Sequence, residues 1–178
     1  MLAVGVFACG AAAVAALRPP AIAAPPLALP AAAAGLPIER PLPSLTLRDD
    51  TGASVALDAL RGKPTWLLFF RGVYCPSCRA QLQALAERSA AVESSGVDLI
   101  AISPDQPEAL ARLRAELGLK FRLLSDANET AVTALCAGLA HCQLLVDSAG
   151  VVRWGAFSES WSAATAPEVI LRAASSLR

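Results

Sequence analysis

Two cysteines separated by two residues form the part of this sequence best suited to chemistry, Cys75-Pro76-Ser77-Cys78. The motif lies where an apolar run gives way to a helical pattern, so Cys75 is expected at or before the first turn of a helix. Unpaired N–H groups and the helix dipole stabilise a thiolate there, the nucleophilic form of cysteine. Pro76 suits the first helical position. We predict a redox-active pair, with Cys75 as nucleophile and Cys78, on the same helix face, as resolving thiol.

Neighbouring side chains are candidates to support this pair. Arg71 and Arg79 would add positive potential near the thiolate, and Tyr74 is expected to pack beside Cys75 as a platform for a partner. A static disulfide and one half of a four-thiolate zinc site are the structural alternatives for the two cysteines. Zinc would need a second close-spaced pair of thiolates. We predict neither a metal ligand set nor a cofactor.

A second pair of cysteines, Cys136 and Cys142, brackets Gly138, so that one ends a helix and the other opens a strand. The six-residue separation is too wide for the usual zinc knuckle. In an exported chain these two residues could form a second disulfide, or a relay that accepts oxidation from Cys75 and Cys78. The alternative for Cys136 is a small buried apolar residue.

His141 is the only histidine of the chain. Its intrinsic pKa is near neutral, so it is a candidate general base for Cys75 or a stabiliser of the Cys75 thiolate. The alternative is a solvated loop residue.

Strands alternate with helices along the rest of the pattern. Strands are expected at 44–47, 54–57, 65–70, 97–102, 121–124, 144–146 and 151–154, the first two as a hairpin. Helices are expected from after Cys78 to Gly96 and at 107–118, 128–136 and 167–177. The alternation implies crossover units and a mostly parallel sheet. Three tryptophans are expected to pack in the interior: Trp66, Trp154 and Trp161.

The first 37 residues differ in composition from the rest. An apolar run from Leu2 to Leu17 precedes an Ala/Pro-rich stretch, a pattern typical of an export signal followed by a linker. We predict a leader over 1–37, a domain over 38–178, and a location in the periplasm or on the outer face of the membrane. An uncleaved leader would anchor the chain. Cys9, which follows Val-Phe-Ala in a lipobox-like order, is a candidate for lipidation.

Composition narrows the function further. The chain has 178 residues, of which 55% are hydrophobic and 17% charged, with 15 basic and 15 acidic side chains. This excludes a disordered protein, and the absence of a basic excess argues against nucleic acid as a partner. We expect contact with a membrane only through an uncleaved leader or a lipid anchor.

The order of these patterns resembles the alkyl hydroperoxide reductase/thiol-specific antioxidant family, the peroxiredoxin-like redoxins. The matching stretches run from Leu45 to Gly52, Leu60 to Pro64, Phe69 to Cys78, Leu99 to Asp105, Phe121 to Asp126 and Leu144 to Gly150. The resemblance implies an α/β thioredoxin-like fold, with a central mixed sheet flanked by helices and an N-terminal β-hairpin.

Several positions depart from the family pattern. The Pro and Thr that precede the peroxidatic cysteine of typical peroxiredoxins are Leu68 and Gly72 here, so the Thr that would orient a peroxide is absent. The buried Asp of thioredoxins, six residues before the first cysteine, is Phe69. His141 stands near the position of the family's Arg or of the thioredoxin cis-Pro.

These observations favour a thiol oxidoreductase of the cell envelope. The short Cys75–Cys78 spacing favours thiol-disulfide exchange as the main reaction, with protein disulfides as substrates and a thiol reductant as partner. The alternative, which the family resemblance favours, is a thiol-dependent peroxidase that reduces peroxide. A less favoured alternative is copper binding by the two thiolates and His141.

Overall fold

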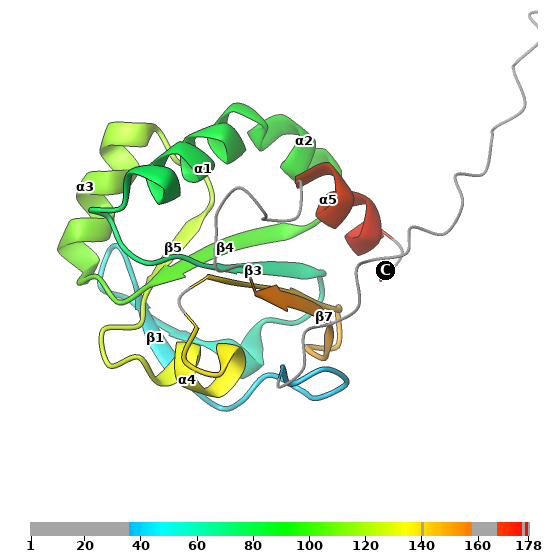
Figure 1. Cartoon of the computed structure of the whole chain (residues 1–178). Helices are drawn as coiled ribbons and strands as arrows, with labels where there is room; N and C mark the ends of the chain where they lie inside the picture. The colour runs from blue at the N-terminus through cyan, green and yellow to red at the C-terminus, as the bar shows by residue number, and fades with distance from the viewer. Residues whose placement is uncertain (1–35, 140, 158–166, 176, 178) are drawn as a thin grey trace, which may run out of the picture.

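The computed structural model describes residues 36–139, 141–157, 167–175 and 177, which contain one sheet with helices on both faces (Figure 1). The strands are β1 (Thr46–Asp49), β2 (Ser54–Ala56), β3 (Thr65–Phe69), β4 (Asp98–Ser103), β5 (Arg122–Ser125), β6 (Cys142–Val146) and β7 (Val152–Phe157). The helices are α1 (Pro76–Glu87), α2 (Ser89–Ser94), α3 (Pro107–Leu117), α4 (Thr130–Cys136) and α5 (Pro167–Ser175), with a 3-10 turn at Leu57–Ala59. Cys9, Trp161 and nearly all of the predicted leader lie outside the described residues.

The seven strands are arranged in the order β2-β1-β5-β4-β3-β6-β7. Parallel pairing joins β3 to β4 and β4 to β5, whereas the other four neighbouring pairs are antiparallel. The mixed sheet implied by the family resemblance is confirmed. The expectation of a mostly parallel sheet is wrong, because the β1–β2 hairpin and the tight β6–β7 connection add antiparallel strands around a three-stranded parallel centre.

Strand β3 separates two cores because its side chains alternate between the faces of the sheet. Trp66 and Leu68 face a core shared with α1, α2, α3 and α5, whereas Leu67 and Phe69 face a core shared with α4. Figure 1 shows α1, α2 and α3 on one side of the sheet and α4 on the other. Because helices cover both faces of the sheet at β3, its residues form a continuous apolar run instead of alternating with polar residues. The predicted packing of Trp66 and Trp154, 1% and 4% exposed, is confirmed.

The helix boundaries follow local signals in one case and not in another. Helix α3 begins at Pro107 and ends at Leu117, and Gly118 caps it with a φ of 63°, the left-handed conformation that glycine adopts readily. The single helix expected up to Gly96 is instead broken at Arg88, with φ −99° and ψ 13°. Arg88 hydrogen-bonds to the Ala84 carbonyl oxygen and pairs with Glu168 of α5. Within the described residues, no helix has the length and apolar character needed to cross a membrane.

Candidate active site

Cys75 lies at the N-terminus of the helix that follows β3, where the sequence predicts it. It is the N-cap residue of α1, with φ −82° and ψ 113°, and Pro76 begins the helix. Cys75 Sγ accepts a hydrogen bond from the backbone N–H of Cys78 at 3.4 Å and lies 3.3 Å from Ser77 Oγ. The cysteine is 7% exposed. Helix N–H groups and a hydroxyl are therefore placed to stabilise a thiolate at this sulfur.

The pKa values of the two thiols move in opposite directions. Burial by itself would raise the pKa of Cys75, but hydrogen bonds from the side chains and backbones of Cys78 and Ser77 outweigh it and lower this pKa below 9.0. Burial and the hydrogen bond to Cys75 raise the pKa of Cys78 to about 12. Both are free thiols in this structure. This asymmetry suits Cys75 as nucleophile and Cys78 as resolving thiol, roles that stay predictions.

The three other candidates around the pair take different positions. Tyr74 is 66% exposed next to Cys75, and the Arg71 guanidinium lies 6.0 Å from the centre of its ring. Arg79 Nη2 pairs with Glu116 of α3 at 2.6 Å, and Arg79 Nη1 donates to the Val73 carbonyl oxygen at 3.3 Å. Arg79 is thus engaged with α3 and with the backbone before Cys75, rather than standing free beside the thiolate.

Asp105 belongs to the site, although sequence reasoning assigned it no role. It follows β4, the parallel neighbour of β3, so the two strands end at the same edge of the sheet. Asp105 Oδ2 accepts hydrogen bonds from the Val73 backbone N–H at 2.9 Å and from Ser103 Oγ at 2.8 Å. Its place directly after the strand next to the one that precedes Cys75 is the signal that could have found it.

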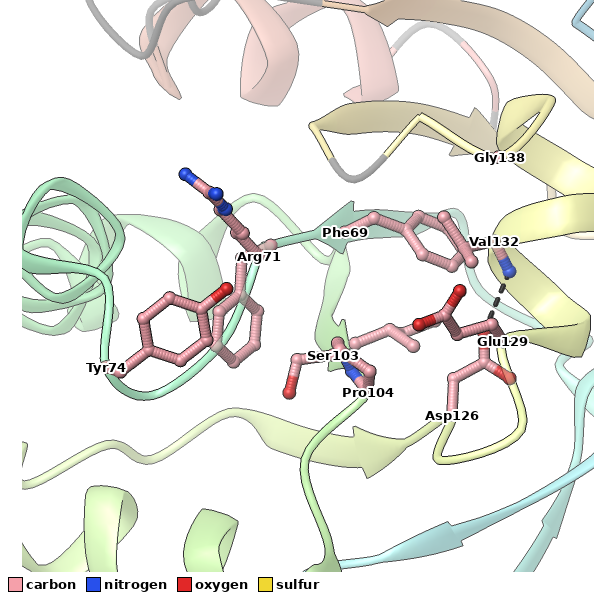
Figure 2. A pocket seen from close by; sticks show the side chains of 11 residues that line it. Phe69, Arg71, Tyr74, Ser103, Pro104, Asp126, Glu129, Val132 and Gly138 are labelled. Carbon is pink, nitrogen blue, oxygen red and sulfur yellow. Dashed lines mark hydrogen bonds between the residues drawn. The ribbon is translucent and has the colours of Figure 1, made fainter.

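A pocket of about 200 Å³ opens at this edge of the sheet. Figure 2 shows Arg71 and Tyr74 at one end and Asp126, Glu129 and Val132 at the other. Apolar side chains line much of it between these ends: Phe69, Phe70, Ile102 and Pro104. Both carboxylate oxygens of Asp126 are occupied by α4, where they accept from the Thr130 hydroxyl and the Ala131 and Val132 backbone N–H groups. The pocket therefore joins the Cys75 turn to the start of α4.

His141 lies in the loop before β6, near the end of β3. Burial, and then the positive charge of Arg71, lower the pKa of its imidazole below 6.5. A lowered pKa keeps the ring neutral at neutral pH, which suits a proton acceptor and not a cationic partner for a thiolate. The role of His141 as a base stays a prediction.

Cys136 and Cys142 form a disulfide, with their Cα atoms 5.8 Å apart. Both residues are 0% exposed and belong to the core on the α4 face, whereas Cys75 and Cys78 belong to the core on the opposite face. The sheet therefore separates the two pairs. This placement favours a structural disulfide that joins the end of α4 to the start of β6 over a relay.

The described residues contain no group of three or more His, Cys, Asp or Glu side chains placed to hold a metal ion. Within this part of the chain, His141 thus does not complete a copper site with Cys75 and Cys78. The thioredoxin-type slot for a buried Asp holds Phe69, which packs on the α4 face away from the two thiols.

Comparison with known proteins identifies the family of this chain. The model of the AhpC/TSA family matches residues 38–155. The chain belongs to this family. Relatives of the AhpC/TSA chain include Rv2521 of Mycobacterium tuberculosis, assigned as a peroxiredoxin, which is 35% identical over 92 residues. Peroxiredoxin Bcp of Escherichia coli is 33% identical over 84 residues. These matches cover 52% and 47% of this chain and 59% and 54% of those proteins, so the chain spans about half the length of the curated relatives it matches.

Solved structures agree on the fold. Peroxidoxin BcpB of Mycobacterium tuberculosis superposes with a TM-score of 0.69 at 20% identity, covering 80% of this chain and 99% of that one. Peroxiredoxin Q of Xanthomonas campestris superposes with a TM-score of 0.67 at 18% identity, covering 78% and 96%. The predicted thioredoxin-like fold and the resemblance to the AhpC/TSA family are confirmed. Between the two reactions left open by the sequence, the AhpC/TSA relatives favour the peroxidase over disulfide exchange.

Proposed function

We propose that this protein is a thiol-dependent peroxidase with Cys75 as its peroxidatic cysteine. The observation that carries the proposal is a thiol at the N-terminus of α1, with its pKa lowered by hydrogen bonds, in a chain of the AhpC/TSA family. A thiolate is the reactive form of cysteine toward peroxides. The peroxiredoxin names of the relatives support peroxide as the substrate.

The proposed reaction has two steps within the chain. The Cys75 thiolate attacks one oxygen of the peroxide, an S–O bond forms, the O–O bond breaks, and the departing oxygen takes up a proton and leaves as alcohol or water. The Cys78 sulfur then attacks the Cys75 sulfenic acid, an S–S bond forms, and hydroxide leaves with the Cys78 proton as water. A thiol reductant restores both thiols by exchange. Because the leaving hydroxide takes up the Cys78 proton, formation of the disulfide needs no separate proton acceptor at the position of Phe69.

The pocket beside Tyr74 indicates which kind of peroxide the protein would prefer. Cys75 does not itself line the pocket, but Arg71 and Tyr74 of the turn before it do. The apolar part of the lining, with Phe69, Phe70 and Ile102, would receive the organic group of an alkyl hydroperoxide. Hydrogen peroxide has no such group, so the pocket would contribute nothing to its binding. We therefore expect an organic hydroperoxide to oxidise Cys75 faster than hydrogen peroxide does.

Time-resolved oxidation tests the proposal. The fully reduced protein receives one equivalent of hydrogen peroxide or of cumene hydroperoxide, is quenched with an alkylating reagent, and is mapped by mass spectrometry. We expect a Cys75–Cys78 disulfide to form far faster than a small free thiol is oxidised. The Cys78→Ser variant should stop at a Cys75 sulfenic acid. Oxidation of Cys75 at the rate of a small free thiol with both peroxides would contradict the proposal.

Thiol-disulfide exchange is the second candidate. The observation that favours it is the short pair itself, with the Cys78 N–H bonded to Cys75 Sγ, together with Gly72 at the position of the peroxide-orienting Thr. If exchange is the main reaction, the Cys78→Ser variant should trap a mixed disulfide with a protein disulfide substrate. In that case peroxide oxidation should be slow in the same protein.

We also propose that the protein is exported, on the basis of the apolar and Ala/Pro-rich composition of residues 1–37. Cell fractionation, together with the mass of the mature N-terminus, tests this proposal. A variant lacking residues 2–17 serves as the control and should stay in the cytoplasm. Recovery of the full-length chain in the cytoplasm with its first residues intact would contradict export.

A further inference from the structure

The peptide groups before Cys75 are held from two sides. The Val73 N–H donates to Asp105 Oδ2 at 2.9 Å, and the Val73 carbonyl oxygen accepts from Arg79 Nη1 at 3.3 Å. Both holding side chains are anchored in turn: Asp105 Oδ2 also accepts from Ser103 Oγ at 2.8 Å, and Arg79 Nη2 pairs with Glu116 at 2.6 Å. We refer to these contacts on Val73 as the Val73 clamp.

The clamped residue lies in the middle of the turn that delivers the nucleophile. The Cys75 N–H donates to the Gly72 carbonyl oxygen at 3.1 Å, which closes a four-residue turn with Val73 at its second position. Gly72 has a φ of 150°, and a Cβ atom there would lie 2.7 Å from Tyr74 Cε1 and 3.2 Å from Asp105 Oδ2. A rotation of the Val73 peptides would therefore move Cys75 relative to α1.

The location of Cys75 Sγ depends on this turn more than on the helix alone. Its stabilising contacts are the Cys78 N–H at 3.4 Å and Ser77 Oγ at 3.3 Å. These contacts weaken steeply when the donor and the sulfur move out of line. An N-cap side chain keeps these partners only while its own backbone stays extended, and the preceding turn sets that conformation.

We propose that Asp105 and Arg79 are positioning residues that act through Val73 to hold the Cys75 sulfur at the N-terminus of α1. The proposal rests on the proposed role of Cys75 as nucleophile, but not on whether Cys75 attacks a peroxide or a disulfide. Asp105 reaches the turn from the β4–α3 connection and Glu116 holds Arg79 from α3, so the clamp makes the reactivity of Cys75 depend on an element that does not carry it.

The charge of Asp105 and its hydrogen bond to Val73 predict opposite changes in Cys75 reactivity when Asp105 is replaced, and this difference makes the proposal testable. By charge alone, removal of an anion near the turn would favour the thiolate and raise Cys75 reactivity. By geometry, loss of the acceptor for the Val73 N–H would lower it. The charged and titratable groups around this turn are Arg71, Tyr74, Cys78 and Arg79 on the turn and α1, Asp105 after β4, and His141 before β6.

The test measures the rate of Cys75 alkylation by iodoacetamide against pH in the reduced protein, followed by peptide mass spectrometry. This readout needs no peroxide, so the clamp can fail while the proposed peroxidase stands, and the reverse. The Asp105→Ala variant should react about tenfold more slowly at neutral pH, with its profile moved to higher pH. Asp105→Asn keeps an acceptor oxygen for the Val73 N–H and should stay within about twofold of the parent.

Two further variants complete the design. Glu116→Ala releases Arg79 by removing the acceptor on an exposed residue of α3, so it stays informative if Asp105→Ala fails to fold, and it should slow alkylation by a smaller factor. Glu108→Ala, at an exposed carboxylate in the first turn of α3, is the charge-matched control. Alkylation of the Asp105→Ala variant at or above the parent rate, or equal slowing by Asp105→Ala and Asp105→Asn, would overturn the clamp. If Asp105→Ala does not fold, an unchanged rate for Glu116→Ala would overturn it.

Discussion

The two cysteine pairs of this protein differ in redox state and in the face of the sheet on which they lie. Cys75 and Cys78 are free thiols at the N-terminus of α1, in the core shared with α1, α2, α3 and α5. Cys136 and Cys142 are joined in a disulfide on the opposite face of the sheet, in the core shared with α4. All four residues are buried, but Cys75 keeps 7% of its surface exposed next to Tyr74, whereas Cys78, Cys136 and Cys142 are 0% exposed.

This difference shows how one residue type serves two purposes in a small domain. A helix N-terminus supplies N–H donors that favour a thiolate, so Cys75 is poised to react. A sealed apolar core keeps water and other thiols away from Cys136–Cys142, so its bond is expected to persist while the other pair cycles. The sheet between them prevents direct contact. We therefore expect changes at Cys75 and Cys78 to affect mainly turnover, and changes at Cys136 and Cys142 to affect mainly the free energy of unfolding.

The largest expected effect is the loss of the nucleophile. Cys75→Ser should reduce peroxide turnover on the order of 10⁴-fold or more, because the hydroxyl of serine is not ionised at neutral pH. A peroxide-consumption assay with a small thiol as reductant measures it. The matched change on the other face, Cys136→Ala with Cys142→Ala, should retain most of the turnover. Collapse of turnover in that folded double variant would assign the second pair to the electron path.

The next effect is a difference in reactivity between the two thiols of the active pair. The pKa of Cys75 is lowered below 9.0, and that of Cys78 is raised to about 12. Cys75 therefore has the larger thiolate fraction at neutral pH, so it should be alkylated about 10³-fold faster than Cys78 there. Peptide mass spectrometry of the reduced protein across pH measures the ratio. Similar rates at the two cysteines would break the predicted asymmetry.

The smallest effect concerns stability. Replacing Cys136 and Cys142 by alanine removes the disulfide and should lower the free energy of unfolding by about 2 kcal/mol. The disulfide restricts the unfolded chain by closing a short loop, and the double variant lacks this restriction. Denaturant unfolding of the oxidised parent and the double variant measures the change. The Cys75→Ser variant is the control and should unfold at nearly the parent midpoint. A larger loss in the control than in the double variant would reverse the assignment of the two pairs.

Much of the fold could be predicted from local patterns. The hairpin, the buried β3 and the helix Pro107–Leu117 all carry signals within a few residues, and the structure confirms them. The break at Arg88 has no such signal, because Val92 continues the apolar spacing and packs in the same core as α1. The pairing directions of the outer strands depend on which edge each strand joins, which a one-dimensional pattern does not contain.

The close placement of Cys75 and Cys78 was predictable for the same reason, and the surroundings of the pair were not. Cys75, Pro76 and Cys78 are neighbours in sequence, so their spacing at the start of a helix already implies a close pair. Arg79 was expected to act through its charge. Its contacts with Glu116 and with the Val73 carbonyl oxygen came from the packing of α1 against α3.

By itself, the amino-acid sequence determined the family, the order of the elements and the position of a thiol at a helix N-terminus, because these follow from short-range patterns of residue type. Only the tertiary structure decided that the two cysteine pairs lie on opposite faces, and that Asp105 holds the turn before Cys75. The first fact depends on which face of the sheet α1 and α4 each cover. The second depends on β3 and β4 ending at one edge of the sheet, which brings together residues about thirty positions apart through a hydrogen bond whose geometry only the folded chain establishes.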